Sequence, residues 1–327
     1  MHNETGPSVR LTKVEIILFI VACLSVITGC QSSRPTNTAS TNEPTKTSPS
    51  STSDFQKQHR EAEQQFRPEI EAQRQQNENE AKQALDPGAI AAVSETEDAI
   101  KFISENKKDE ALPAIEQATG KINILLARNP ASALIPVDAE VVVIDTAPTD
   151  PKPVDQILQL AMIATARREF PVARTLLASV VSELRIRTTN LPLATYPAAL
   201  QQAAKLLDQG KNQDAGNVLL TALNTLVVVD HVIPLPLILA QAAIEAAKSQ
   251  RQNKDAALTL LQTAKNELNR SRQLGYLAND SEYKGLDSEI SSLESAIKGT
   301  SDTSSLFSHL RDRIGAFLKR QKDHEQR

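Results

Sequence analysis

Apolar residues recur at helical spacing through most of residues 86–327. In the segment 212–229 they stand three or four residues apart, at Ala215, Val218, Leu219, Ala222, Leu223 and Leu226. An α-helix has about 3.6 residues per turn, so this spacing places these side chains on one face. The pattern repeats in about nine segments that are joined by short loops. It predicts a mainly α fold, built as a multi-helix bundle of antiparallel helical hairpins.

Three of the expected turns are each followed by a pair of alanines seven residues apart. The pairs are Ala111 and Ala118, Ala215 and Ala222, and Ala257 and Ala264. Small side chains at that spacing let two helices of a hairpin pack closely, as in tetratricopeptide repeats. The steps from one pair to the next are 104 and 42 residues, whereas a tetratricopeptide array repeats every 34 residues or so. The sequence therefore predicts helical hairpins rather than a repeat array.

Two stretches have strand character. Residues 139–145 are rich in β-branched side chains and are flanked by prolines, and residues 184–188 alternate apolar and charged side chains. Both patterns are typical of strands. We expect the two stretches to pair as one small two-stranded β-ribbon.

Residues 1–29 have the layout of a bacterial export signal. Arg10 and Lys13 precede a mostly apolar run over residues 16–27, which is shorter than the ~20 residues that span a bilayer. The run ends in Ile27, Thr28, Gly29 and Cys30, which resembles the lipobox of bacterial lipoproteins. The small residues there admit the peptidase, and the cysteine thiol receives the lipid. An ordinary signal peptide or an uncleaved anchor is the alternative, and Glu4 and Glu15 depart from a purely positive N-terminal region.

The lipobox predicts a lipoprotein whose mature chain begins at an acylated, palmitate-bearing Cys30. Several acyl chains anchor a protein firmly, whereas one chain is marginal. We expect a position in the cell envelope facing the periplasm, and Gln31 favours the outer over the inner membrane. Cleavage would remove Cys23 and acylation would use Cys30, so the mature protein would form no disulfide.

Two segments separate the lipobox from the body. Residues 30–54 are dominated by Ser, Thr and Pro, a composition that predicts a disordered tether. Residues 55–85 are rich in Gln and charged side chains and predict a helix that breaks or kinks near Pro68. We interpret this helix as a solvated spacer, with a coiled-coil contact as the alternative. Residues 86–327 form the expected all-helical domain.

Composition argues against several classes of function. The chain has only 10 glycines and no tryptophan, and its formal net charge is −4. Phosphate-binding loops need glycine, single-stranded nucleic acids are bound by aromatic platforms, and polyanions are bound by basic surfaces. No Gly-rich phosphate loop, HExxH helix or GxSxG elbow is present in the sequence. We expect no enzyme activity, no cofactor, no metal and no nucleic-acid partner.

The central sequence resembles a known family. Residues 191–200 read Leu-Pro-Leu-Ala-Thr-Tyr-Pro-Ala-Ala-Leu and lead into an Ala/Leu-rich hairpin, which is followed by Asp230-His231 and then Ile233-Pro234-Leu235-Pro236. With Leu274-Gly275-Tyr276, these segments resemble the YfdX family of bacterial exported proteins, over about residues 86–310. The resemblance implies a mainly helical envelope domain tied to acid or multidrug stress, with chaperone-like behaviour and no catalytic residues. The lipobox and the tether are additions to the family pattern.

Three residues are candidate interaction positions. His231 beside Asp230 could sense pH, since imidazole titrates near pH 6.5, or could simply cap a helix end. Tyr196, between Pro192 and Pro197, is a packing or surface aromatic. The leading expectation is a lipid-anchored, non-enzymatic envelope protein that binds other proteins in stress tolerance, as a holdase for example. The alternative is a small-ligand module with a cleft between Ala-rich helices. The oligomeric state is left open.

Overall fold

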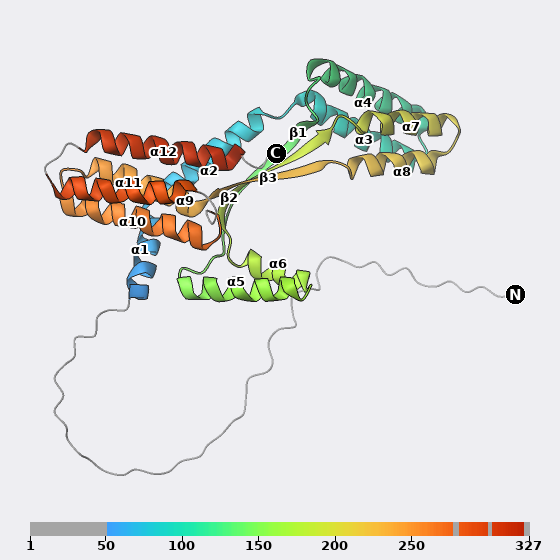
Figure 1. Cartoon of the computed structure of the whole chain (residues 1–327). Helices are drawn as coiled ribbons and strands as arrows, with labels where there is room; N and C mark the ends of the chain where they lie inside the picture. Colours follow the sequence, from blue (N-terminus) through green and yellow to red (C-terminus); the bar gives the residue numbers. More distant parts are fainter. Residues whose placement is uncertain (1–50, 277–280, 300–302, 324–327) are drawn as a thin grey trace, which may run out of the picture. The chain divides into compact units, whose positions relative to one another are not determined.

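The computed structural model describes residues 51–276, 281–299 and 303–323, which belong to one compact unit, Pro49–Arg327 (Figure 1). The expected signal peptide, the lipobox and residues 30–50 of the expected tether lie outside the described residues. Residues 51–54, which we assigned to the tether, form the first turn of helix α1 (Ser51–Gln65). Ser, Thr and Asp are common at helix starts, and this turn reads Ser-Thr-Ser-Asp.

A three-stranded antiparallel sheet connects the helical parts. Its order is β1-β2-β3, with strands β1 (Leu134–Asp145), β2 (Ser182–Pro192) and β3 (Val227–Pro234). The predicted ribbon is confirmed, because Val141 pairs with Ile186. The third strand is new, and it begins inside the segment 212–229 that we expected to be one helix. Val227, Val228 and Val229 are β-branched and pair with residues 190, 189 and 188 of β2.

A first group of helices packs at one end of the sheet. It consists of α3 (Pro87–Ser104), α4 (Lys108–Arg128), α7 (Tyr196–Asp208) and α8 (Asn212–Leu223). These helices form two antiparallel hairpins, and their core, called the first core here, includes Ile135 of β1 and Leu191 of β2. Asn106 and Gly210 adopt positive φ angles of 58° and 72° in the two hairpin turns. Asn and Gly tolerate this conformation, so these residues permit the turns.

A second group packs at the other end of the sheet. It consists of α9 (Leu235–Ser249), α10 (Lys254–Gln273), α11 (Ser281–Lys298) and α12 (Ser304–Asp323). Their core, called the second core, includes Val141, Leu184 and Ile233 from the three strands. All six alanines of the predicted pairs are buried: Ala111, Ala118, Ala215, Ala222, Ala257 and Ala264. The predicted close packing of helical hairpins is thus confirmed, and the fold is mainly α.

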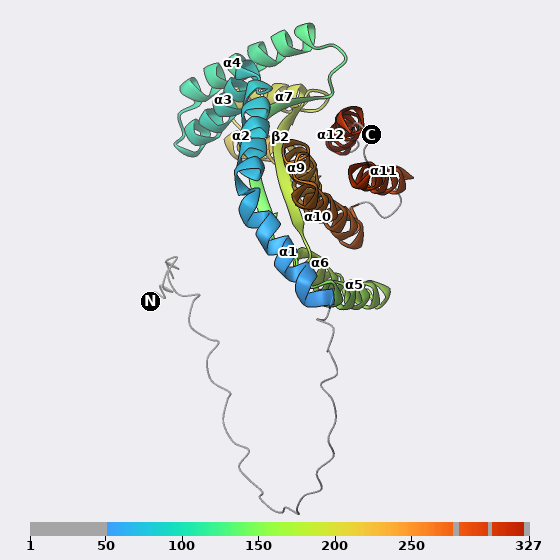
Figure 2. The ribbon, with the colours of Figure 1, turned by 90° about the vertical axis from the view of Figure 1, so that its left-hand side faces the viewer.

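Helices α1 and α2 (Arg67–Gln83) differ from the expected solvated spacer. The predicted break near Pro68 is confirmed, since the two helices meet at Phe66. However, one side of both helices is buried, at His59, Ala62, Phe66, Ile70, Asn77 and Ala81. These positions are three, four or seven residues apart and form one stripe, most of which packs on the second core. Figure 2 shows α1 and α2 following each other along one side of the unit.

A short hairpin is inserted between β1 and β2. Asp150 caps the N-terminus of helix α5 (Pro151–Ala166), and its side chain accepts a hydrogen bond from the Lys152 amide at 3.0 Å. Helix α6 (Phe170–Ala178) returns antiparallel to it. A small apolar cluster around Val154, Val180 and Leu274, together with hydrogen bonds from Gln273 to Pro151 and Asp155, connects the base of this hairpin to the rest of the unit. The hairpin therefore exposes much of its surface.

Candidate functional site

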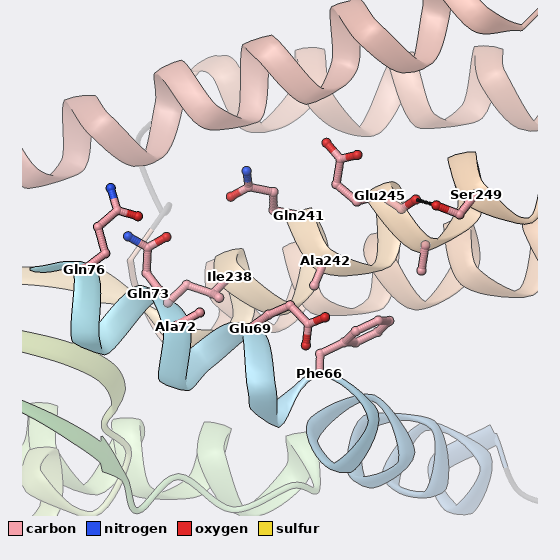
Figure 3. Close-up of a pocket in the computed structure, with 11 residues that line it drawn as sticks. Phe66, Glu69, Ala72, Gln73, Gln76, Ile238, Gln241, Ala242, Glu245 and Ser249 are labelled. Carbon is pink, nitrogen blue, oxygen red and sulfur yellow. Dashed lines mark hydrogen bonds between the residues drawn. The ribbon is translucent and has the colours of Figure 1, made fainter.

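A groove of about 420 Å³ runs between α2 and α9 (Figure 3). It is lined by Phe66, Glu69, Ala72, Gln73, Gln76, Ile238, Gln241, Ala242, Glu245, Ala246 and Ser249. The lining residues span about ten positions on each helix, which corresponds to roughly 15 Å at a rise of ~1.5 Å per residue. Three small alanines, Ala72 of α2 and Ala242 and Ala246 of α9, leave the room between the helices.

The chemistry of the groove is mixed. Figure 3 shows the amide side chains of Gln73, Gln76 and Gln241 on the same side of α2 and α9. Each amide can donate and accept hydrogen bonds. Glu69 and Glu245 add carboxylates, and Glu245 lies 3.9 Å from Arg311 of α12. This arrangement can satisfy the polar groups of an extended chain and attract positive charge.

The hydroxyl of Ser249 closes one end of the groove. It donates to the backbone carbonyl oxygen of Glu245 at 3.1 Å, within its own helix. Phe66 and Ile238 supply the apolar part of the lining. The lining thus offers apolar contact, hydrogen bonds and negative charge, which are the elements of a binding groove.

Asp230 forms a cross-strand ion pair. Its two carboxylate oxygens accept hydrogen bonds from Nε and Nη2 of Arg187 at 2.7 and 2.8 Å, since the two residues are direct partners in the sheet. The hydrogen bonds from Arg187 lower the pKa of the Asp230 carboxyl, and the same bonds raise the pKa of Arg187. Asp230 is therefore part of the sheet surface, and the guanidinium satisfies its charge.

His231 lies on the opposite face of β3 from Asp230, because side chains alternate along a strand. It pairs with Ile186 and shares its face with Ile233, both of which belong to the second core. Our alternative that His231 caps a helix end is wrong, since residues 227–234 form a strand. Its Nδ1 is buried and has no hydrogen-bond partner among the described residues.

Tyr196 is fully buried in the first core at the start of α7. Burial raises the pKa of its hydroxyl to about 12, so the side chain is neutral at physiological pH. The structure therefore gives Tyr196 a packing role. It also separates Tyr196 from His231, since the two side chains belong to different ends of the sheet.

A buried polar cluster was missed by sequence reasoning. Nδ1 of His59 lies 2.7 Å from Oε1 of Glu267, which joins α1 to α10. One turn further along α10, Arg270 donates to the backbone carbonyl oxygens of Pro148 and Ala147 at 2.8 and 3.3 Å. Burial lowers the pKa of Arg270, while the nearby Glu267 raises it. In the sequence, His59 stands in a polar segment and nothing there signals that it is buried.

The remaining predictions concern absences and the N-terminus. Ile27, Thr28, Gly29 and Cys30 lie outside the described residues. Within the described ranges, no three His, Cys, Asp or Glu residues are grouped as they would be around a metal ion. None of the described helices combines the length and the apolar character needed to cross a membrane.

Comparisons with known proteins give one family match. The model of the family described as YfdX protein matches residues 92–232, which run from α3 into β3. A search of curated proteins finds no match. Among solved structures, YfdX of Salmonella Typhi aligns over 46% of this chain and 93% of its own, with 16% identity and a TM-score of 0.32. So low a score supports no structural argument.

The matched residues contain the first group of helices, the α5–α6 hairpin and most of the sheet. The α2–α9 groove lies outside them, so the match says nothing about its role. The family that the sequence resembled is thus found by comparison as well, over a shorter stretch than expected: residues 92–232 of this chain match the YfdX protein family.

Proposed function

We propose that this chain is a lipid-anchored protein of the bacterial cell envelope that binds other proteins through the α2–α9 groove and has no enzymatic role. The lipobox-like sequence ending at Cys30 supports the anchor. The mixed lining of the groove supports polypeptide binding and is the observation that carries it. The YfdX match supports a part in stress tolerance, as that resemblance implies.

The groove suits a short extended segment. Its length of roughly 15 Å accommodates four or five residues at ~3.3 Å each. Glutamine amides can pair with a peptide backbone, and alanines leave room for side chains. Glu69 and Glu245 favour a segment that carries Lys or Arg. A groove of this kind binds through hydrogen bonds and charge together with apolar contact, which fits a protein that accepts many clients.

Site-specific crosslinking in intact envelopes tests this proposal. A photoreactive amino acid replaces Gln241 in the groove, and the control replaces Gln201, an exposed glutamine of α7. We expect polypeptide adducts at position 241 and none at 201, at neutral or mildly acidic pH. Ala72→Phe should abolish the adducts by filling the groove, while Ala198→Phe, at an exposed position of α7, should not. Equal adducts at both positions would contradict the proposal.

A second candidate is a small amphiphilic cation in the same groove. Phe66, Ile238 and the three alanines offer apolar contact, and two glutamates offer negative charge. Thermal unfolding in the presence of cationic amphiphiles tests it. A rise in melting temperature that Ala72→Phe removes, without polypeptide adducts at position 241, would favour this candidate over protein binding.

The anchor has a separate test. Mass spectrometry of the mature N-terminal peptide should show Cys30 carrying diacylglycerol and a further acyl chain. Cys30→Ser should abolish the incorporation of labelled palmitate into the protein. A peptide that spans Thr28, Gly29 and an unmodified Cys30 would refute the lipid anchor.

A further inference from the structure

The α5–α6 hairpin exposes an unusual amount of apolar surface. It carries six of the 13 large apolar side chains that are exposed among the described residues: Leu160, Met162, Ile163, Phe170, Val172 and Leu177. Met162 is 65% exposed and Phe170 is 54% exposed. Single exposed apolar residues are ordinary, but a cluster on one protruding element marks an interaction surface.

The same hairpin is basic at its tip. Arg167, Arg168 and Arg174 are exposed around the turn, against a single acid, Glu169. The chain as a whole has a net charge of −4, so this positive group is local. Basic side chains next to exposed apolar ones are the combination that binds anionic membrane surfaces, through phosphate contacts and shallow insertion.

The base of the hairpin lies near α1, the first described helix of the unit. Along α10, Asn266 donates to Gln58 of α1 at 2.6 Å, and Gln273 donates to the carbonyl oxygen of Pro151 in α5 at 3.1 Å. These two α10 residues are about 10 Å apart along the helix. Figures 1 and 2 show the start of α1 and the α5–α6 hairpin at the same end of this unit. Ser51 follows Cys30 by 21 residues, which can reach no further than ~70 Å.

We propose that the α5–α6 hairpin rests on an anionic phospholipid surface. Met162, Ile163 and Phe170 enter the headgroup boundary, and Arg167 and Arg168 pair with lipid phosphates. The inference deepens the proposed lipid anchor and rests on it for the biological setting. A second copy of the chain fits this surface less well, because a symmetric contact would bring the arginine groups of the two copies together.

Vesicle flotation with a lipid-free chain tests the proposal. The chain starts at Gln31 and so contains the whole compact unit and all three apolar clusters, without the export signal. We expect it to float with vesicles of phosphatidylethanolamine and phosphatidylglycerol, to detach as salt rises, and to bind phosphatidylcholine vesicles at least tenfold more weakly, roughly what two surface arginines contribute.

Variants locate the contact. Phe170→Ser should lower partitioning about tenfold by removing an inserted ring, and Arg167→Gln with Arg168→Gln should lower it by at least as much. The matched control is Ile124→Ser on α4, which removes a side chain of 59% exposure from the first group of helices and should leave partitioning unchanged. Circular dichroism of each variant should match the parent chain.

Three outcomes would overturn the inference. The first is that the chain does not float with anionic vesicles at low salt. The second is that Ile124→Ser lowers partitioning as much as Phe170→Ser does. The third is that the chain sediments as a dimer, which Phe170→Ser converts to a monomer, and does not bind vesicles. The last would assign the hairpin to a second copy. The tested chain carries no lipid and keeps its α2–α9 groove. None of these results would therefore bear on the proposed lipid anchor or on protein binding in the groove, which have separate tests.

Discussion

Arg270 is the largest side chain that the described part of the fold buries completely. Nη1 and Nη2 of its guanidinium donate to the carbonyl oxygens of Pro148 and Ala147, in the connection from β1 to α5, and its buried Nε has no hydrogen-bond partner among the described residues. Glu267, one turn earlier, contacts His59 of α1. Segments that are distant in the sequence therefore meet at one buried polar cluster. Such clusters contribute little net stability when complete but are costly to disrupt, because a buried charge loses its partner.

Glu267→Gln should lower the free energy of unfolding by about 2 kcal/mol, because it removes the negative charge near the buried Arg270. Urea unfolding measures the change. The control is Glu294→Gln, which breaks a more exposed pair with Lys265 and should cost less than about 1 kcal/mol. If the two substitutions lowered the free energy of unfolding equally, burial would not be what makes the loss of the Glu267 charge costly.

Asp230 allows a prediction about pH. Its carboxyl pKa is lowered from an ordinary value of 3.8 by the hydrogen bonds from Arg187. A group whose folded pKa is depressed contributes stability above its unfolded pKa, and this stability is lost as the pH falls through the folded pKa. Asp230→Asn should therefore lower the free energy of unfolding slightly near neutral pH. The difference between the variant and the parent protein should disappear as the pH falls below 3.8, because the Asp230 carboxyl of the parent becomes protonated. Unfolding curves at several pH values test this, and a pH-independent effect would contradict it.

At the scale of elements, α1 and α2 are anchored by a stripe in which polar residues take core positions. His59 and Asn77 stand where a simple amphipathic pattern would place Leu or Ile. Phe66, at the break between the two helices, contributes both to the second core and to the lining of the α2–α9 groove. The two helices are thus an integral part of the unit, and they supply one wall of the proposed binding site.

Phe66→Ala should lower the free energy of unfolding by about 3–4 kcal/mol, because it leaves a cavity in a packed core. Phe170→Ala is the matched control, since Phe170 is 54% exposed on α6 and should change stability by no more than ~0.5 kcal/mol. Chemical denaturation measures both. If Phe66→Ala changed the free energy of unfolding no more than the control does, α1 and α2 would be a solvated spacer and not part of the packed unit.

At the scale of the whole unit, one sheet serves two cores. The outer strand β1 contributes Ile135 to the first core and Val141 to the second, and the central strand β2 contributes Leu191 and Leu184 in the same way. Both strands therefore depend on the two groups of helices for burial of their side chains. Loss of either core should expose part of each strand and weaken the pairing of the rest.

This sharing predicts one cooperative unfolding transition. Leu207→Ala in the first core and Leu261→Ala in the second should each cost about 3 kcal/mol and should shift the same midpoint. Circular dichroism and hydrogen exchange of the two groups of helices would follow it. Two transitions, each sensitive to only one substitution, would show that the cores unfold independently.

Much of the fold could be predicted from local patterns. These patterns act within one or two helical turns, so the sequence alone reveals them: the helical spacing of apolar residues, the alanines seven residues apart, and proline or glycine at helix ends. The β-ribbon could be predicted for the same reason, because strand character is also a local pattern. The third strand was not, because Val227, Val228 and Val229 extend an apolar run that also suits a helix, and only pairing with β2 decides between the two.

Some of the candidate sites could likewise be predicted from the sequence, and others could not. The lipobox around Cys30 is a contiguous motif, so the sequence alone suffices to predict it. The resemblance to the YfdX family also rests on contiguous segments, and the family match covers those within residues 92–232. The α2–α9 groove and the His59–Glu267–Arg270 cluster join residues that are some 170 to 210 positions apart. Only tertiary packing brings such residues together, because burial of His59 depends on a helix whose position relative to α10 no local pattern encodes.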